Sequence, residues 1–255
     1  MGVKYFIGAG DIYVAQLDPN FNPLDFRNVG EAPVFEFDPT VEYADNFATN
    51  KLAPNLQDLH IPIKNSAAVH LTIKERTAEN LELELFGEAS QETGGSYTGN
   101  DPFPANIQAG QTVLIPGGHV GISALVIKDS AATPATVAPT DYTVNPDSPL
   151  VTFLTIGTHV QPFHAFSYTY MDSTVVSILE VPTPEMCIVF DGRNLATPTE
   201  KIWCRLDRVS LGPAAKVTMK SGTDAGTGNT VAAYELAGSA LIVPGKTSYG
   251  EYRSH

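Results

Sequence analysis

Few residues of this chain occur in patterns that support catalysis or cofactor binding. Gly8-Ala-Gly10-Asp contains two glycines of a dinucleotide-binding fingerprint, but the third glycine is missing. A strand rather than a helix is expected to follow, whereas such a site needs a helix N-terminus directed at the phosphates. We therefore expect a tight turn at Gly8–Gly10. No Gly-x-Ser-x-Gly sequence is present to carry a nucleophilic serine.

The histidines and cysteines do not have the spacing of a metal site. His159 and His164 are the closest histidine pair, but a five-residue offset on a strand would direct them to opposite faces. Cys187 and Cys204 lie in apolar, strand-like runs without a third ligand at zinc-site spacing. We expect two buried, reduced thiols, with a disulfide between neighbouring strands as the alternative. The other histidines are His60, His70, His119 and His255.

Acidic residues are numerous, and their sequence positions do not define a catalytic pair. Glu82 and Glu84 are expected to be ordinary exposed charges. Two carboxylates facing each other across a cleft could serve a glycosidase, but sequence alone does not bring two such partners together. We therefore expect no enzymatic activity, no cofactor and no metal site.

The composition is typical of a β-rich globular protein with many turns. The 255 residues are 43% hydrophobic and 17% charged, with 21 glycines and 19 prolines. No apolar run approaches the ~20 residues that cross a bilayer, so membrane insertion is not expected. The first residues lack a signal-peptide pattern, which indicates synthesis in the cytosol. Without a repeat or a Ser/Gly-rich linker, a single domain over residues 1–255 is expected.

Alternation of apolar and polar residues predicts many short strands. Val69, Leu71 and Ile73 alternate with polar residues, as in a half-buried strand. Asp191-Gly192 is typical of a hairpin turn. The fold class is therefore predicted as all-β, a sandwich or split barrel, with one flanking helix. Further strands are predicted over residues 112–115, 122–128, 142–145, 151–156, 165–171, 174–180, 186–190 and 201–211.

Residues 77–86 are predicted to form that helix. The run from Leu81 to Leu85 also alternates like a strand, but its leucine and glutamate content favours a helix. Thr77 can cap the amino end, and Gly87 stands where a left-handed C-cap is expected. Ala78, Leu81 and Leu85 fall on one helical face, which we expect to pack against the sheet.

Three segments lack a sustained strand or helix period. Residues 38–60 are polar with scattered aromatic residues, and such long loops are commonly functional or mobile. Residues 88–110 are rich in glycine and proline, which indicates a second loop. Residues 244–255 are expected to form a C-terminal arm.

This arrangement resembles the major tail (tail tube) protein of long-tailed, non-contractile bacteriophages. A strand followed by Thr77-x-Glu-Asn-Leu-x-x-x-Leu-Phe-Gly87 is similar to that family, as are Asp141-Tyr-Thr-Val144 and Phe166-x-Tyr-x-Tyr170. The resemblance implies a tail tube fold and hexameric rings that stack into a hollow tube around a tape-measure protein. Tail terminator and distal tail proteins would be further partners. The location implied is the virion tail, assembled in the bacterial cytoplasm.

The resemblance also implies particular surfaces. The 38–60 segment would reach the next ring, with Tyr43, Asn46, Phe47 and Lys51 at that interface. The 88–110 loop would decorate the outer surface.

The channel is a second surface that the resemblance implies. A Phe166–Glu180 hairpin and the Lys201–Leu211 strand would line the channel, where Asp172 and Glu180 would supply acidic charge. The outer wall is the alternative position for both acids. The net charge of -13 suits DNA that passes without sticking, although plain solubility also explains it.

A binding module is the alternative function. In this hypothesis a β-sandwich recognises carbohydrate or a host surface, and exposed aromatic rings stack on sugars. Ring or tube formation distinguishes the two hypotheses, because a lectin-like module would stay small. The candidate aromatic residues are Tyr97, Phe103, Tyr249 and Tyr252.

Overall fold

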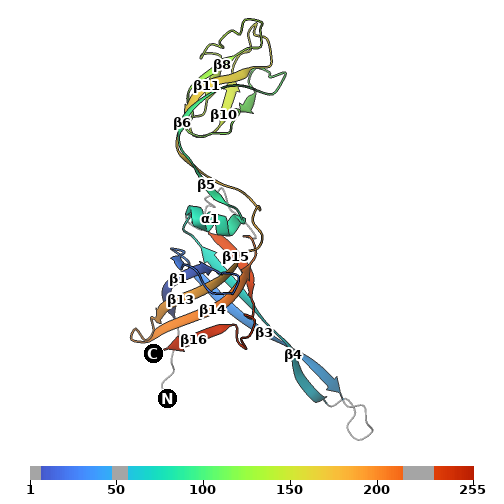
Figure 1. The fold of residues 1–255 in the computed structure, drawn as a ribbon, viewed down its shortest axis with the longest axis vertical. Coiled ribbons are helices and arrows are strands. Elements are labelled where there is room, and N and C mark those ends of the chain that lie inside the picture. Colours follow the sequence, from blue (N-terminus) through green and yellow to red (C-terminus); the bar gives the residue numbers. More distant parts are fainter. Residues whose placement is uncertain (1–6, 48–56, 215–232) are drawn as a thin grey trace, which may run out of the picture. The chain divides into compact units, whose positions relative to one another are not determined.

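The computed structural model describes residues 7–47, 57–214 and 233–255. The chain divides into two compact units, where the sequence predicted one domain. Unit 1 comprises residues 1–89 and 176–255, and unit 2 comprises residues 90–175 (Figure 1). Each unit has a hydrophobic core of its own. Unit 2 is therefore an insertion in unit 1. The sequence shows no linker at its boundaries, because the chain enters and leaves unit 2 through the strands at residues 89–92 and 173–176.

Unit 1 is built on one antiparallel sheet in the strand order β2-β1-β13-β14-β15-β4-β3, with β16 paired to β14. The sheet is completed only by residues from both ends of the chain, since β1 pairs with β13 and β15 pairs with β4. The strands are β1 (Gly8–Gln16), β2 (Arg27–Asn28), β3 (Val34–Phe47), β4 (Gln57–Ile73), β13 (Glu185–Asn194), β14 (Lys201–Leu211), β15 (Tyr234–Ala240) and β16 (Gly250–Ser254).

Helix α1 (Ala78–Leu85) contributes Leu83 to the core of unit 1, which it shares with the buried face of the sheet. Thr77 is the N-cap, as predicted, and its hydroxyl accepts a hydrogen bond from the Asn80 amide. The left-handed residue at the other end is Phe86, at φ 50°, rather than Gly87. Gly87 is needed for space instead, because a Cβ there would lie 1.9 Å from the Ser177 carbonyl oxygen.

Unit 2 contains two three-stranded antiparallel sheets with a shared core, including Phe153, Phe163 and Tyr168. One sheet has the order β6-β11-β8 and the other β7-β10-β9. A separate pair, β5 with β12, lies where the chain passes between the units in sequence. The strands are β5 (Ala89–Glu92), β6 (Gly95–Pro102), β7 (Thr112–Leu114), β8 (Ser123–Lys128), β9 (Tyr142–Val144), β10 (Leu150–Phe153), β11 (His164–Tyr170) and β12 (Ser173–Val176).

The predicted fold class is confirmed: the described residues form antiparallel sheets and one helix. The three segments that were predicted as loops or an arm each contain strands, and the prediction is wrong over those strands. Residues 38–60 belong to the β3–β4 hairpin, apart from residues 48–56, which lie outside the described part. Residues 88–110 contain β5 and β6, and the expected C-terminal arm forms β16 on the main sheet.

The two predicted glycine turns are also wrong. Gly8–Gly10 lies inside β1 and Asp191-Gly192 lies inside β13, where Gly10 and Gly192 are directly opposite. A Cβ on Gly192 would lie 2.5 Å from the Ala9 carbonyl oxygen. These glycines therefore allow two strand backbones to approach closely, and they do not reverse the chain.

Candidate assembly surfaces

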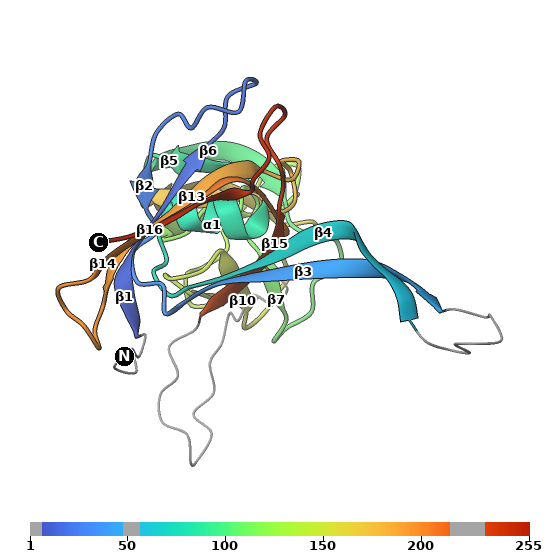
Figure 2. The same ribbon diagram turned by 90° about the horizontal axis from the view of Figure 1, so that it is seen from below.

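The β3–β4 hairpin of unit 1 is exposed along most of β3 and along the part of β4 that pairs with the outer end of β3. Its strands stay paired from Val34 with Thr72 to Phe47 with Gln57, and the outer half extends beyond the other strands of the sheet (Figure 1 and Figure 2). Only the inner half reaches the core, where Val69 and Leu71 are fully buried. The outer half therefore lacks the packing that ordinarily covers a strand of this length.

Large apolar side chains remain uncovered from Phe37, which pairs with the buried Val69, outward along the described part of the hairpin. On β3 they share one face, since residues two apart on a strand point the same way. Leu59 and Ile61 lie on the other face of the hairpin, where their cross-strand partners are Asn46 and Ala44. Ile63 is the extra residue at a register shift. The seven side chains, each at least 39% exposed, are Phe37, Val41, Tyr43, Phe47, Leu59, Ile61 and Ile63, and we call them the apolar arm.

Polar contacts fix the two strands of the arm to each other. His60 Nδ1 lies 2.5 Å from Asp45 Oδ1, and the Gln57 amide donates to the same oxygen at 2.8 Å. The Tyr43 ring stacks on His60 with ring centroids 4.0 Å apart. Lys64 pairs with Glu42 at 2.9 Å further along. The arm is thus held as a paired hairpin without support from a core.

The sequence-predicted interface residues lie on this arm where they are described. Tyr43 is 47% exposed and Phe47 is 54% exposed, and Asn46 is also exposed. Lys51 lies outside the described residues. Sequence reasoning missed Leu59, Ile61 and Ile63, although they alternate with His60, Pro62 and Lys64, because residues 38–60 were expected to form a loop and the next strand was recognised only around Val69–Ile73.

A free sheet edge accompanies the arm. β3 is the last strand of the main sheet and pairs only with β4 among the described strands. Its 14 residues therefore present unpaired backbone groups on one side. Such a long edge is a template for pairing with another chain unless it is covered.

The buried face of α1 differs from the predicted one. Asn80, Leu83 and Glu84 are buried, whereas Ala78, Leu81 and Leu85 are half-buried. The Asn80 side chain explains part of the difference, because its amide donates to the Val29 and Glu75 carbonyl oxygens and its Oδ1 accepts from Arg27. Glu84, which was expected to be exposed, is buried, so that prediction is wrong.

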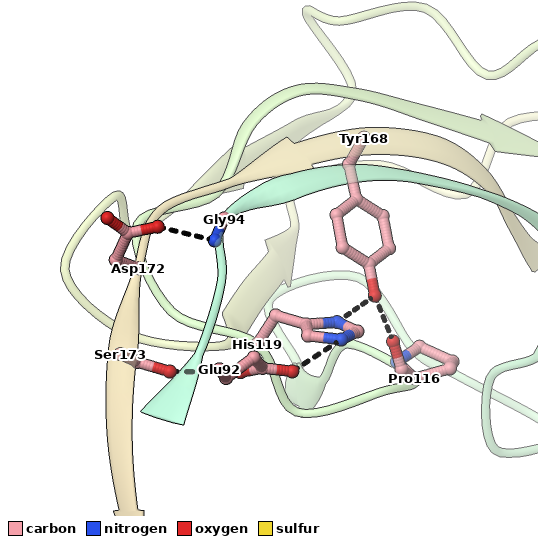
Figure 3. Close-up of polar contacts among 7 residues, drawn as sticks. All are labelled: Glu92, Gly94, Pro116, His119, Tyr168, Asp172 and Ser173. Carbon is pink, nitrogen blue, oxygen red and sulfur yellow. Dashed lines mark hydrogen bonds and ion pairs between the residues drawn. The ribbon is translucent and has the colours of Figure 1, made fainter. Parts of the chain in front are cut away.

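The residues predicted to line a channel are separated by the division into units. Asp172 belongs to unit 2, where its carboxylate accepts from the Gly94 amide at 2.6 Å (Figure 3), and Glu180 belongs to unit 1. Both side chains are exposed. The expected Phe166–Glu180 hairpin is wrong, because β11 pairs with β6 and β8 while β12 pairs with β5. The predicted Lys201–Leu211 strand is confirmed as β14.

The aromatic residues of the binding-module hypothesis do not form an exposed platform. Phe103 is 3% exposed and belongs to the core of unit 2. Tyr97 is half-buried and stacks on Tyr168. Tyr249 packs against the core of unit 1, which leaves Tyr252 as the one candidate that is largely exposed.

A cavity of about 510 Å³ lies in unit 1. Its floor includes Leu83, Phe86 and Met186, and Glu79 and Glu82 line it from α1. Arg27 also lines it, but its guanidinium donates to Asn80 Oδ1 and the Glu79 carbonyl oxygen. Burial lowers the pKa of Arg27, and the nearby charges of Glu79 and Glu82 partly oppose this effect. These contacts hold the Arg27 side chain against α1.

The described residues contain free cysteines and no cluster of potential metal ligands. No group of three or more potential ligands from His, Cys, Asp and Glu converges there. Cys187 and Cys204 are both free, as expected, although Cys204 is only partly buried. None of the described helical residues forms a helix of sufficient length and apolarity to cross a membrane.

Comparison with known proteins identifies a family. Residues 5–253 match the family described as "Protein of unknown function UCP028589", so the match spans nearly the whole chain. No curated protein matches the chain significantly.

Proposed function

We propose that this chain, which belongs to the family described as "Protein of unknown function UCP028589", is a structural subunit that assembles with copies of itself into a hollow tube. In this proposal the copies form hexameric rings, and the rings stack as the tail tube of a long-tailed phage. The sequence resemblance supports the phage assignment, and the apolar arm supports self-assembly.

The apolar arm is the observation that carries the proposal. A typical soluble monomer does not hold several large apolar side chains in water on one extended hairpin, and larger exposed patches mark interaction sites. Fully burying one such side chain stabilises a complex by roughly 1.5–3 kcal/mol. Aromatic residues such as Tyr43 and Phe47 are also the type that concentrates binding energy at interfaces. The arm therefore suits an interface with a neighbouring subunit.

The free edge of β3 supports lateral assembly. A neighbour that adds a strand there would satisfy the unpaired backbone groups and extend the antiparallel sheet. Ring closure would leave no such edge exposed, which is the general way that β-structures avoid unlimited edge pairing. The arm and the edge together would serve contacts in two directions.

The remaining parts of the proposal follow from the resemblance. The tube would enclose a tape-measure protein, end on tail terminator and distal tail proteins, and later conduct DNA. Assembly would occur in the bacterial cytoplasm before the tail joins the virion. The chain would have no enzymatic activity. An acidic lumen, with Asp172 and Glu180 contributing, stays a prediction, as does their alternative position on the outer wall.

Assembly of the purified protein tests this proposal. Negative-stain microscopy and sedimentation should show rings or tubes for the wild type. The double variant Tyr43→Ser, Phe47→Ser should remain a folded, unassembled subunit, because it removes two aromatic contacts without touching a core. The matched control is Leu114→Ser, Leu150→Ser, which changes two exposed leucines that face each other on unit 2.

Two results would contradict the proposal. Wild-type protein that stays monomeric at high concentration would remove the basis for tube formation. Normal tubes from the Tyr43→Ser, Phe47→Ser variant would show that the arm is not an assembly interface. Circular dichroism on each variant ensures that a missing tube does not reflect an unfolded subunit.

A further inference from the structure

The cavity beside α1 in unit 1 combines an apolar floor with an acidic rim. Leu83, Phe86 and Met186 are buried at its floor, whereas Leu24 lines the same cavity and is 66% exposed. Its volume of about 510 Å³ falls within the roughly 300–1,000 Å³ of ordinary binding pockets. The cavity therefore has room for an apolar side chain from a partner.

The acidic rim sets the charge that an occupant should carry. The acidic residues that line the cavity are Asp25, Glu79, Glu82 and Glu88. Arg27 is the one basic residue among the described residues of the lining, and its guanidinium already donates to Asn80 Oδ1 and the Glu79 carbonyl oxygen. Asp25 and Glu88 are exposed. A positively charged group next to an apolar one would therefore be attracted to this site.

The apolar arm and the cavity lie at opposite edges of the main sheet. Strand residues of the cavity come from β1, β2 and β13, whereas the arm belongs to β3 and β4. In the strand order, β1 is separated from β3 by β13, β14, β15 and β4, and neighbouring strands are ~4.8 Å apart. The arm also extends away from α1 and β1 (Figure 1 and Figure 2). Each copy therefore directs its arm away from its own cavity.

The end of the arm carries the kind of groups that the cavity favours. Residues 48–56 connect β3 to β4, and Lys51 is the only charged residue in that segment. Leu52 follows it directly, so a cation and an apolar side chain are adjacent in the sequence. Asp45, an acid on the neighbouring part of β3, already contacts His60. The end of the arm thus complements an apolar cavity with an acidic rim.

On the basis of the self-assembly proposed above, we propose that the cavity receives the Lys51-Leu52 end of the apolar arm from a second copy of the chain. The leucine would contact the apolar floor, and Lys51 would face the acidic rim. Each copy then offers one arm and one cavity, a heterologous contact that closes into a ring or continues as a filament. An anionic partner such as nucleic acid is disfavoured, because the acids of the rim would repel it.

Charge reversal on either side of this contact tests the proposal in the full-length protein. Lys51→Glu should raise the critical concentration for assembly at least about tenfold, because it brings like charges together. The cavity variant Asp25→Lys, Glu88→Lys should raise it similarly, since its new lysines would face Lys51. Lys51→Ala, which removes the charge without reversing it, should give a smaller loss. Sedimentation measures assembly, and circular dichroism verifies that each variant is folded.

Mixing the two charge-reversal variants distinguishes a lost contact from a damaged subunit. In the mixture, the new acid at position 51 of one variant meets the new lysines of the other, and the unchanged arm meets the unchanged cavity. An equimolar mixture should therefore assemble close to the wild-type concentration, although each variant alone does not. The defect of each variant alone should also shrink in ~1 M salt, where charges are screened within about 3 Å.

The matched control is Asp147→Lys, Glu235→Lys, which changes the net charge equally at two exposed acids outside the cavity. It should assemble like the wild type. Charge-reversal variants that assemble as well as the wild type, or a mixture that does not recover, would overturn this contact and leave the proposed tube in place. A wild-type chain that never assembles would instead remove the tube and the contact together.

Discussion

Glu84 shows how strongly one buried group can depend on its surroundings. The side chain is 1% exposed, and neither carboxyl oxygen has a hydrogen-bond partner among the described residues. Burial raises the pKa of Glu84 to about 8, against a smaller opposing effect of Arg76. A buried ionised carboxylate without partners is costly, so the protein holds this group neutral near physiological pH.

Glu84→Gln should therefore stabilise unit 1 at alkaline pH. Between the ordinary glutamate value and about pH 8 the folded state binds more protons than the unfolded state, so wild-type stability falls as pH rises. The slope is at most about 1.4 kcal/mol per pH unit. Thermal melts of both proteins should diverge toward pH 8.5 and converge near pH 5. Parallel melting curves across this range would contradict the assignment.

At the scale of elements, α1 is held by a face that its own periodicity does not identify. Leu81 and Leu85, on the predicted face, are only half-buried. Leu83 is the one leucine of α1 in the core of unit 1. Asn80 provides the second anchor through two donated hydrogen bonds to backbone oxygens. A polar and an apolar residue together thus orient the helix on the sheet.

Leu83→Ala should lower the free energy of unfolding of unit 1 by about 2–5 kcal/mol, because it leaves a cavity in a packed core. The control is Leu81→Ala, which removes the same atoms from a half-buried position and should cost clearly less. Urea titration followed by circular dichroism measures both. An equal loss in the two variants would mean that the helix packs through the other face.

For the whole molecule, the division into two cores is the main consequence. Residues 90–175 have a core with aromatic contacts of its own, such as Phe153 stacked on Phe163 at 4.9 Å. Their connection to unit 1 runs through β5 and β12, which pair with each other. Because β5 and β12 pair, the residues that flank the inserted unit lie close together in unit 1. The inserted unit can therefore be replaced by a short linker.

We expect calorimetry of the full chain to show two unfolding transitions, because units with separate cores need not unfold together. Replacing residues 90–175 with a short Gly-Ser linker should abolish one transition and keep the other. The shortened protein should still assemble through the apolar arm. One cooperative transition in the full chain, together with an insoluble shortened protein, would show that the two units depend on each other for folding.

The sequence by itself determined the local features. Alternation over Lys201–Leu211 predicted β14, and Thr77 identified the start of α1, because a strand buried on one face and a helix cap both leave local signals. Tertiary structure decided the rest. Asp191-Gly192 has the chemistry of a turn, yet it lies within β13 because Gly10 comes to face Gly192 from a distant part of the chain. The burial of Glu84 likewise depends on residues far apart in sequence, and no local period encodes which of them meet.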